Sequence, residues 1–174
     1  MPSLSERLQE LGVQVGTKGI SAPLKKKSLP EIEMLLDGAW KETPRGAAFV
    51  SERNYPCSYI QGDICIQPPT PARAISRWLK DESLDGHPLS AYAFIDTETT
   101  GLSGGAGTYT FLIGVGRFIN QEFRIAQFFM RDPGEEIAQL TALENYLAPT
   151  CVFVSYNGKS FDLPILTSRF SHHG

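Results

Sequence analysis

The sequence predicts an α/β domain built on a mixed sheet in residues 90–174, preceded by a short α/β extension in residues 1–89. Two runs, 91–95 and 151–154, are apolar at every position, which is typical of strands buried on both faces. Such strands lie side by side in the middle of a sheet covered by helices. We therefore expect the strands near 91–96 and 151–155 to be adjacent and parallel.

The elements between and after these two runs complete the expected order. Two further apolar runs, 109–118 and 123–130, are joined by a short turn and predict an antiparallel hairpin. A helix over 133–147 is indicated by Asp132 as its cap, Pro133 at its first position and leucines at helical spacing. A second helix is expected near 161–170. The order is strand, strand, strand, helix, strand, helix.

The first 89 residues carry weaker patterns. Short helices are expected near 5–11 and, after a capping box at Ser28–Glu31, up to about Leu36. Residues 46–66 alternate weakly and predict two short strands. A helix over 71–80 has one apolar face, which should point inward if the helix packs against the domain. The residues of that face are Ile75, Trp78 and Leu79.

Composition limits the function. Residues 91–174 hold eight acidic and five basic side chains, which is not the basic footprint of a protein that binds duplex nucleic acid by charge alone. No apolar stretch reaches the ~20 residues of a membrane helix, so no membrane partner is expected. Three cysteines without a C-x-x-C pair argue against a disulfide framework or structural zinc and favour a cytoplasmic location.

Two carboxylates stand at the exit of the first buried strand. Side chains alternate along a strand, so Asp96 and Glu98 should project to the same side. Like charges held that close resist joint ionisation, and a hard cation such as Mg²⁺ or Mn²⁺ relieves the conflict. When the pair is considered alone, a strand that simply ends in a polar turn is the more usual explanation.

A second acidic signal follows the other buried strand. Asp162 comes shortly after the run 151–154, and neighbouring central strands end at the same edge of a sheet, so its carboxylate could join the first two. Three nearby residues have two readings each. Asn157 could bind phosphate or sugar or complete a turn, Lys159 could contact phosphate or be solvated, and Phe161 could stack on a base or join the core.

These two segments resemble a known family. Residues 94–102, FIDTETTGL, resemble the first exonuclease motif of the DEDD superfamily, which has the ribonuclease H fold, and residues 157–164, NGKSFDLP, resemble the second. The intervening segments 103–109 and 127–132 are similar to the YprB-like group of ribonuclease-H-like proteins. The resemblance covers about residues 90–170 and implies the ribonuclease H-like mixed sheet.

The resemblance also implies a site. It assigns Asp96, Glu98 and Asp162 as catalytic residues and as ligands of two Mg²⁺ or Mn²⁺ ions, and Thr99, Asn157, Lys159 and Phe161 as substrate contacts. The family's fourth acid and its Tyr or His base lie in a third motif, which we do not find here, because His172 and His173 come too early. The last strand and helix of the fold are missing as well, so we expect a C-terminally truncated domain with little activity of its own.

Two functions are therefore expected from the sequence. The first is a metal-dependent 3′–5′ exonuclease that hydrolyses phosphodiester bonds of nucleic acid. The second is a catalytically inactive nucleic-acid-binding or scaffolding module that keeps the ribonuclease H-like fold. The expected partner in both is nucleic acid, with DNA and RNA and the protein partners left open.

Overall fold

The computed structural model describes residues 31–68, 73–101 and 107–173. The chain divides into two compact units, Met1–Ile32 and Glu33–Gly174. All strands and α-helices named below lie in the second unit. The helix expected near residues 5–11 lies outside the described residues. A short 3₁₀ helix, η1 (Ile32–Met34), stands where the sequence predicted a helix up to Leu36.

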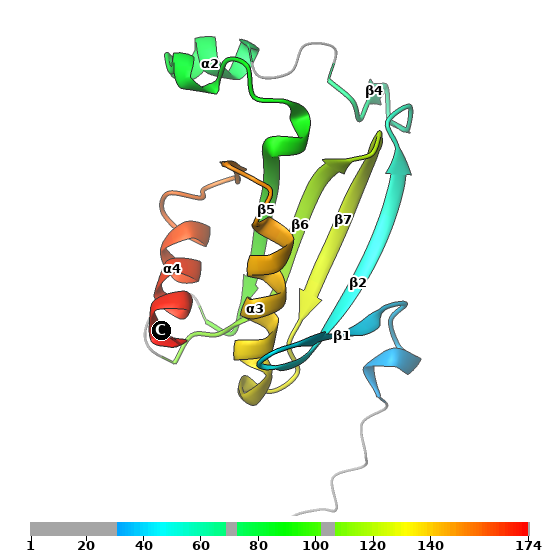
Figure 1. Cartoon of the computed structure of the whole chain (residues 1–174), viewed down its shortest axis with the longest axis vertical. Helices are drawn as coiled ribbons and strands as arrows, with labels where there is room; N and C mark the ends of the chain where they lie inside the picture. Colours follow the sequence, from blue (N-terminus) through cyan, green and yellow to red (C-terminus); the bar gives the residue numbers. More distant parts are fainter. Residues whose placement is uncertain (1–30, 69–72, 102–106, 174) are drawn as a thin grey trace, which may run out of the picture. The chain divides into compact units, whose positions relative to one another are not determined.

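Six strands form one sheet in the order β1-β2-β7-β6-β5-β8 (Figure 1). All neighbours in the sheet are antiparallel except β5 and β8, which run parallel. The bounds of the strands are β1 (Ala39–Thr43), β2 (Gly46–Pro56), β5 (Tyr92–Thr99), β6 (Thr110–Ile119), β7 (Glu122–Phe129) and β8 (Val152–Val154).

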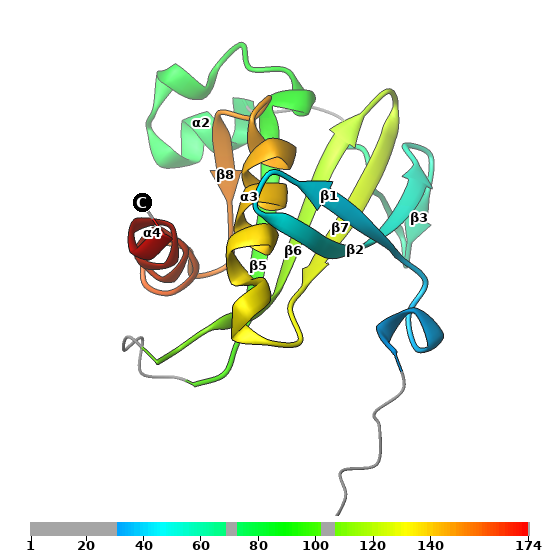
Figure 2. The same ribbon diagram turned by 60° about the horizontal axis from the view of Figure 1, so that its bottom comes forward.

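The four strands after residue 90 have the arrangement that the sequence predicts. The pair β5–β8 is parallel, with Tyr92 opposite Val152, and β6 and β7 form the expected hairpin. Helix α3 (Glu136–Leu147) connects β7 to β8, and α4 (Asp162–His173) follows β8. Figures 1 and 2 show both helices on the same face of the sheet. The mixed α/β sheet predicted from the buried runs is confirmed.

The start of α3 is set by local chemistry. Asp132 accepts a hydrogen bond from the Gly134 N–H and caps a 3₁₀ turn, η4 (Pro133–Glu135), which leads into the helix. The carboxylate of Glu135 reaches back to the N–H of Arg131, one residue before the cap. The cap at Asp132 is the expected one, and Glu135 adds a contact to the backbone one residue earlier.

The extension contributes more to the sheet than its weak patterns indicated. Strand β2 pairs with β7 along its length, from Phe49–Phe129 to Pro56–Glu122, and β1, for which no strand was expected, pairs with β2. The strands β3 (Ile60–Gln61) and β4 (Ile64–Cys65) form a separate small hairpin. The sheet is thus continuous across residue 90, and a domain boundary at that residue remains a prediction.

Helix α2 (Arg73–Leu79) lies where the sequence predicted a helix, but its apolar face is not buried. Trp78 is 82% exposed and Leu79 is 54% exposed, contrary to the expectation that they point inward. Ser76 of this helix is buried, and its hydroxyl donates to the carboxylate of Asp85. A polar contact to the segment after the helix therefore orients α2, while Ile75, Trp78 and Leu79 stay exposed to solvent.

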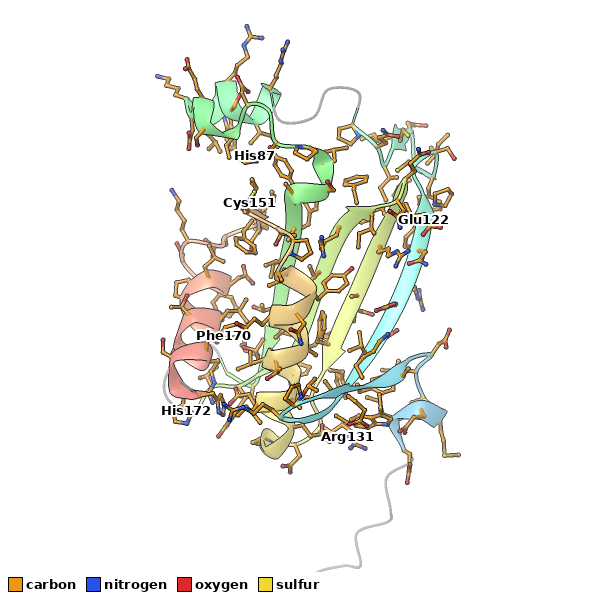
Figure 3. The ribbon with its side chains drawn as sticks, in the orientation of Figure 1. His87, Glu122, Arg131, Cys151, Phe170 and His172 are labelled. Carbon is orange, nitrogen blue, oxygen red and sulfur yellow. The ribbon has the colours of Figure 1, made fainter. Side chains whose placement is uncertain are left out.

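The main core lies between the sheet and the two helices. Alternate residues of β5, including Ala93 and Ile95, pack with Leu140 and Leu143 of α3 and Ile165 of α4. Figure 3 shows Phe170 of α4, which packs against this core. Among the described residues, none of the helices is long and apolar enough to span a bilayer.

The other face of the sheet carries a smaller apolar cluster near the start of β5. Phe94, Phe118 and Phe123 lie with ring centroids 4.9–6.3 Å apart. Gly116 lies beneath them, because a Cβ atom there would stand 2.5 Å from the tip of the Phe123 ring. Aromatic packing therefore covers one end of this face and leaves the carboxyl end of β5 open.

Candidate functional site

The two acidic residues of β5 lie on the face of the sheet opposite the helices. Ile95 and Thr97 are buried toward α3 and α4, so the alternating positions Asp96 and Glu98 point the other way, and both are exposed. In the described part of the chain, neither carboxylate has a hydrogen-bond or ion-pair partner. Two unpaired carboxylates thus share one open surface, as predicted from their spacing.

The sheet leaves room beside Asp96. Its cross-strand neighbour on β6 is Gly114, where an added Cβ atom would have only one neighbour within 4 Å, the backbone oxygen of Asp96 at 3.8 Å. The next residue across the sheet on this face is Gln127 of β7, which is exposed. A small residue opposite the acid gives a ligand access to its carboxylate.

The strand changes its register directly after Glu98. A bulge between Glu98 and Thr99 shifts the pairing with β6. The hydroxyl of Thr99, predicted to contact substrate, donates to the carbonyl of Gly101 at 2.9 Å, so it stabilises the turn that leaves the strand. Thr100 and Tyr109 then exchange two hydrogen bonds, which close the base of the following loop. Residues 102–106 of that loop lie outside the described residues.

Asp162, the third predicted acid, is buried at the start of α4. Its Oδ1 accepts a hydrogen bond from the Thr97 hydroxyl at 2.7 Å, and its Oδ2 accepts one from the Ser155 hydroxyl at 2.5 Å. The residue is 5% exposed. The carboxylate therefore ties three elements together: β5 through Thr97, the end of β8 through Ser155, and α4.

The structure does not bring the three carboxylates together. Thr97 stands between Asp96 and Glu98 but faces the helices, so its partner Asp162 lies on the helix side of the sheet. The part of the chain that the structure describes has no group of three or more His, Cys, Asp or Glu side chains that could hold a metal ion. The expected convergence on one pocket is thus not observed, because Asp162 is engaged by two hydroxyls.

The turn before α4 explains how Asp162 and Ser155 meet. Asn157 has a positive φ of 92°, and its carbonyl accepts hydrogen bonds from the N–H groups of Ser160 and Phe161. Gly158 is buried against Ser155, where a Cβ atom would lie only 2.9 Å from the serine Cβ. The Asn-Gly pair thus folds the chain back on Ser155. Of the predicted substrate contacts here, Asn157 and Lys159 are exposed, and Phe161 is half-buried.

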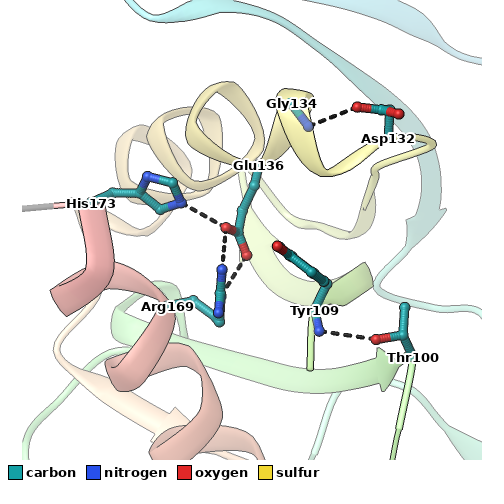
Figure 4. Close-up of polar contacts among 7 residues, drawn as sticks. All are labelled: Thr100, Tyr109, Asp132, Gly134, Glu136, Arg169 and His173. Carbon is teal, nitrogen blue, oxygen red and sulfur yellow. Dashed lines mark hydrogen bonds and ion pairs between the residues drawn. The ribbon is translucent and has the colours of Figure 1, made fainter. Parts of the chain in front are cut away.

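A buried ionic cluster fixes the far end of α4. Arg169 donates two hydrogen bonds of 2.6 Å to the two carboxylate oxygens of Glu136 in the first turn of α3, and Nε2 of His173 lies 2.6 Å from the same carboxylate (Figure 4). The Arg169 guanidinium also stacks over the Tyr109 ring at 4.6 Å. Both charged partners are almost fully buried. The cluster joins α3, α4 and the base of the loop after Thr100.

The ionisation of this cluster follows from its contacts. Burial alone would raise the pKa of Glu136, but hydrogen bonds and charges from Arg169 and His173 lower it below its ordinary value of 4.5. The same pairing raises the pKa of Arg169. Glu136 and Arg169 are therefore held as an ion pair that keeps α4, and with it Asp162, in place.

The carboxylates of the two motifs differ in how well they fit a metal ion. Asp96 and Glu98 offer hard carboxylate oxygens on one open face, which fits Mg²⁺ or Mn²⁺. Asp162 as held does not fit, because both of its oxygens already accept hydrogen bonds in a buried setting. The residues of the first motif therefore fit a divalent cation, whereas the second motif has a structural role in this arrangement.

The comparison with known proteins agrees with this fold. Residues 93–174 match a family model described as the RNase_H superfamily. Residues 93–174 form a ribonuclease H-like domain. The chain is also 38% identical over 87 residues to the "Uncharacterized protein YprB" of Bacillus subtilis (strain 168), which makes the domain YprB-like. That alignment covers 50% of this chain and 21% of the relative, so the chain spans about a fifth of the relative's length.

The family assignment gives the two acidic segments a context. Asp96, Glu98 and Asp162 all fall within the matched ribonuclease H-like domain, whereas β1 and β2 precede it. A domain of this superfamily supports a nuclease-type function on nucleic acid. The sequence had not indicated Thr97, Ser155 and Gly114 as parts of the site. The position of Thr97 between two acids was a signal for that residue, whereas Gly114 and Ser155 meet Asp96 and Asp162 only through the pairing of the strands and the turn before α4.

Proposed function

We propose that this ribonuclease H-like domain is a metal-dependent 3′–5′ exonuclease of the DEDD type that hydrolyses phosphodiester bonds of DNA or RNA. One observation carries the proposal. Asp96 and Glu98 share an open face at the end of the central strand, exposed and without partners among the described residues. Exposed carboxylates on one face supply the hard oxygen ligands that Mg²⁺ and Mn²⁺ prefer.

Asp96 and Glu98 would hold the divalent cations, Mg²⁺ or Mn²⁺. When bound, such ions activate water and stabilise the charge that develops on the phosphate. The chain's own contribution is positioning. The bulge after Glu98 and the paired Thr100 and Tyr109 hold the end of the strand, and Gly114 keeps the space beside Asp96 free.

Asp162 belongs to the same proposal as the third acidic residue, on the likeness of residues 157–164 to the second exonuclease motif. Its present contacts give it a defined task, since it connects the strand of the first two acids to α4 through Thr97. Direct participation in cation binding would require its carboxylate to exchange hydroxyl partners for the ion. The proposal therefore requires Asp162 for cleavage, because it connects β5 to α4, because it carries a negative charge, or for both reasons.

The proposed substrate contacts are Thr99, Asn157, Lys159 and Phe161. Lys159 is exposed one turn before α4 and can contact a phosphate, and Asn157 is exposed beside it. Phe161 is half-buried, so only part of its ring is free to stack on a base. We also place the protein in the cytoplasm, because its three cysteines are free thiols.

The test uses the 174-residue chain and a longer protein that contains it. Each is incubated with 5′-labelled and 3′-labelled DNA and RNA, single- and double-stranded, with Mg²⁺ or Mn²⁺. Stepwise shortening of the 5′-labelled strand from its 3′ end, lost in Asp96→Asn and Glu98→Gln, supports the exonuclease. Asp63→Asn, which changes an exposed acid in the turn between β3 and β4, is the matched control and should leave cleavage unchanged.

A second candidate is a catalytically inactive module that binds nucleic acid or serves as a scaffold. The engagement of Asp162 by Thr97 and Ser155 favours it, because a carboxylate with two buried partners already serves the fold. Binding of oligonucleotides by the longer protein, without cleavage with either ion, would establish this second function and refute the first.

A further inference from the structure

Helix α2 presents its apolar side chains to solvent and its serine to the domain. Trp78 is 82% exposed and Leu79 is 54% exposed, whereas Ser76 is 3% exposed and its hydroxyl donates to Asp85. Trp78 comes two residues after Ser76, which is nearly the opposite side of a helix with about 3.6 residues per turn. The contact that holds α2 therefore turns its tryptophan ring outward. Large apolar groups that lie together on a surface mark interaction sites.

The exposed side of α2 is also basic. Residues 73–80 contain three basic and no acidic residues. Arg73, Arg77 and Lys80 are exposed, and none of the ion pairs in the described part of the chain involves them. Arg73 and Arg77 are one turn apart, where two like charges on a helix repel each other. The acid that follows, Asp81, caps the next 3₁₀ turn instead of pairing with these cations.

From this surface we propose that α2 is a second contact site for single-stranded nucleic acid, separate from the proposed cleavage site. The choice of nucleic acid as the ligand rests on the proposed function. The Trp78 ring stacks on an unpaired base, and the neighbouring cations contact phosphates, which is the combination that sequence-independent binding of single strands uses. A cationic helix with an exposed ring also suits an acidic protein or an anionic membrane, but the ribonuclease H-like domain that follows favours nucleic acid.

Helix α2 lies toward the opposite end of β5 from Asp96 and Glu98. Figure 1 shows the helix beyond the point where β5 begins, and both acids stand in the second half of that strand. At about 3.3 Å per residue, Glu98 lies roughly 20 Å along the strand from its first residue. One strand of nucleic acid must therefore be several nucleotides long to reach both sites. The proposal predicts that long single strands bind more tightly than short ones.

Binding is measured in EDTA, without divalent cations, so that cleavage plays no part. Fluorescence anisotropy of labelled single-stranded DNA and RNA, about 20 nucleotides long, gives the Kd for the 174-residue chain at several salt concentrations. Trp78→Ala should weaken binding about fivefold or more, because the base loses its stacking partner, and Trp78→Phe should retain most of the affinity.

The three cations are tested together. Replacing Arg73, Arg77 and Lys80 by Gln should reduce the slope of log affinity against log salt by about 2, since each phosphate contact on a single strand contributes about 0.7. The matched control makes the same change in net charge on the β1–β2 hairpin and should leave the slope unchanged. Its three exposed residues, all replaced by Gln, are Lys41, Arg45 and Arg53.

Trp78 can also report on binding directly. The chain has two tryptophans, so in Trp40→Phe the tryptophan fluorescence comes from Trp78 alone. Addition of the oligonucleotide should quench this fluorescence, because a base stacks on the ring. Circular dichroism verifies that each variant keeps the fold, which is expected since the replaced side chains of α2 are exposed.

The outcomes separate this site from the proposed exonuclease. An unchanged Kd in Trp78→Ala together with an unchanged salt slope in the triple variant would overturn the proposal, whether or not the protein cleaves nucleic acid. Binding of the unmodified chain to vesicles that contain phosphatidylserine, but to no oligonucleotide, would overturn it as well. Binding through α2 by a protein that cleaves no substrate would support this site and count against the exonuclease alone.

Discussion

The hydroxyl of Thr97 donates a hydrogen bond to Oδ1 of Asp162 over 2.7 Å, across 65 residues of chain. Thr97 stands between the two acids of the first motif, and Asp162 is the acid of the second. The two motifs therefore contact each other through a threonine that faces the helices, while Asp96 and Glu98 face away from them. This contact determines what each acid does for the fold and for the proposed activity.

Replacing Asp162 should cost stability. In Asp162→Ala the hydroxyls of Thr97 and Ser155 lose their acceptor, and the buried Thr97 hydroxyl left unsatisfied costs about 1–3 kcal/mol. Urea unfolding followed by circular dichroism measures the change. Ser160→Ala, an exposed hydroxyl two residues earlier, is the matched control and should change little. An Asp162→Ala protein as stable as the unmodified chain would show that the two hydroxyls do not depend on it.

Replacing Asp96 or Glu98 should leave the stability of the protein unchanged but abolish cation binding. Both side chains are exposed and unpartnered in the described part of the chain, so Asp96→Asn and Glu98→Gln should leave the free energy of unfolding within ~0.5 kcal/mol. Mn²⁺ binding, measured by calorimetry or by electron paramagnetic resonance, should be lost in both. The idea of a cation site on this face fails if the double variant binds Mn²⁺ as the unmodified chain does.

The ion pair between α3 and α4 should depend on pH. The folded-state pKa of Glu136 lies below 4.5, so its stabilising effect is complete above pH 4.5 and is lost as the pH falls through the folded value. Glu136→Gln should destabilise the protein by about 3–5 kcal/mol at neutral pH, because it leaves Arg169 buried without its charge partner.

The measurement compares the unfolding free energies of the two proteins between pH 7 and pH 3. Their difference should stay constant down to about pH 5 and shrink below it. Repeating the comparison in a His173→Gln background removes the contact of the neighbouring imidazole with Glu136. A difference that does not change with pH would contradict the assigned ionisation of Glu136.

Two glycines of β6 should respond differently to the same substitution. Gly116→Ala puts a methyl group 2.5 Å from the Phe123 ring tip, inside a cluster of three aromatic rings, and should cost about 1–3 kcal/mol. Gly114→Ala meets nothing closer than 3.8 Å and should be tolerated or mildly stabilising. Thermal unfolding of the two variants measures the difference in stability. Equal losses of stability would show that contact with the Phe123 ring is not what makes Gly116 necessary.

The pairing of β5 with β8 could be predicted from the sequence because the runs 91–95 and 151–154 are apolar at every position, and the structure pairs them. Their expected burial on both faces is wrong for β8, which is an edge strand of the sheet and has Phe153 46% exposed. The first strand of the sheet could not be predicted. Residues 39–43 of β1 show the burial pattern of an edge strand, with no buried position, and so give no apolar signal.

The candidate site could be predicted only where it depends on local geometry. The common face of Asp96 and Glu98 follows from the alternation of side chains along one strand. The location of Asp162 depends on how the turn at Asn157 and Gly158 folds back on Ser155, a tertiary contact that spacing does not encode. The exposed Trp78 has a similar cause, because the buried Ser76 and its partner Asp85 orient α2.

The pairing of β2 with β7 has a consequence for the order in which the chain folds. Residue 49 meets residue 129, so the sheet can be completed only after a long stretch of chain has been closed into a loop, which is entropically costly and slow. The hairpin β6–β7 and the packing of α3 against β7 involve nearer contacts and can form sooner. During synthesis β2 is made long before its partner β7, and in that interval the unpaired edge of β2 is open to other chains.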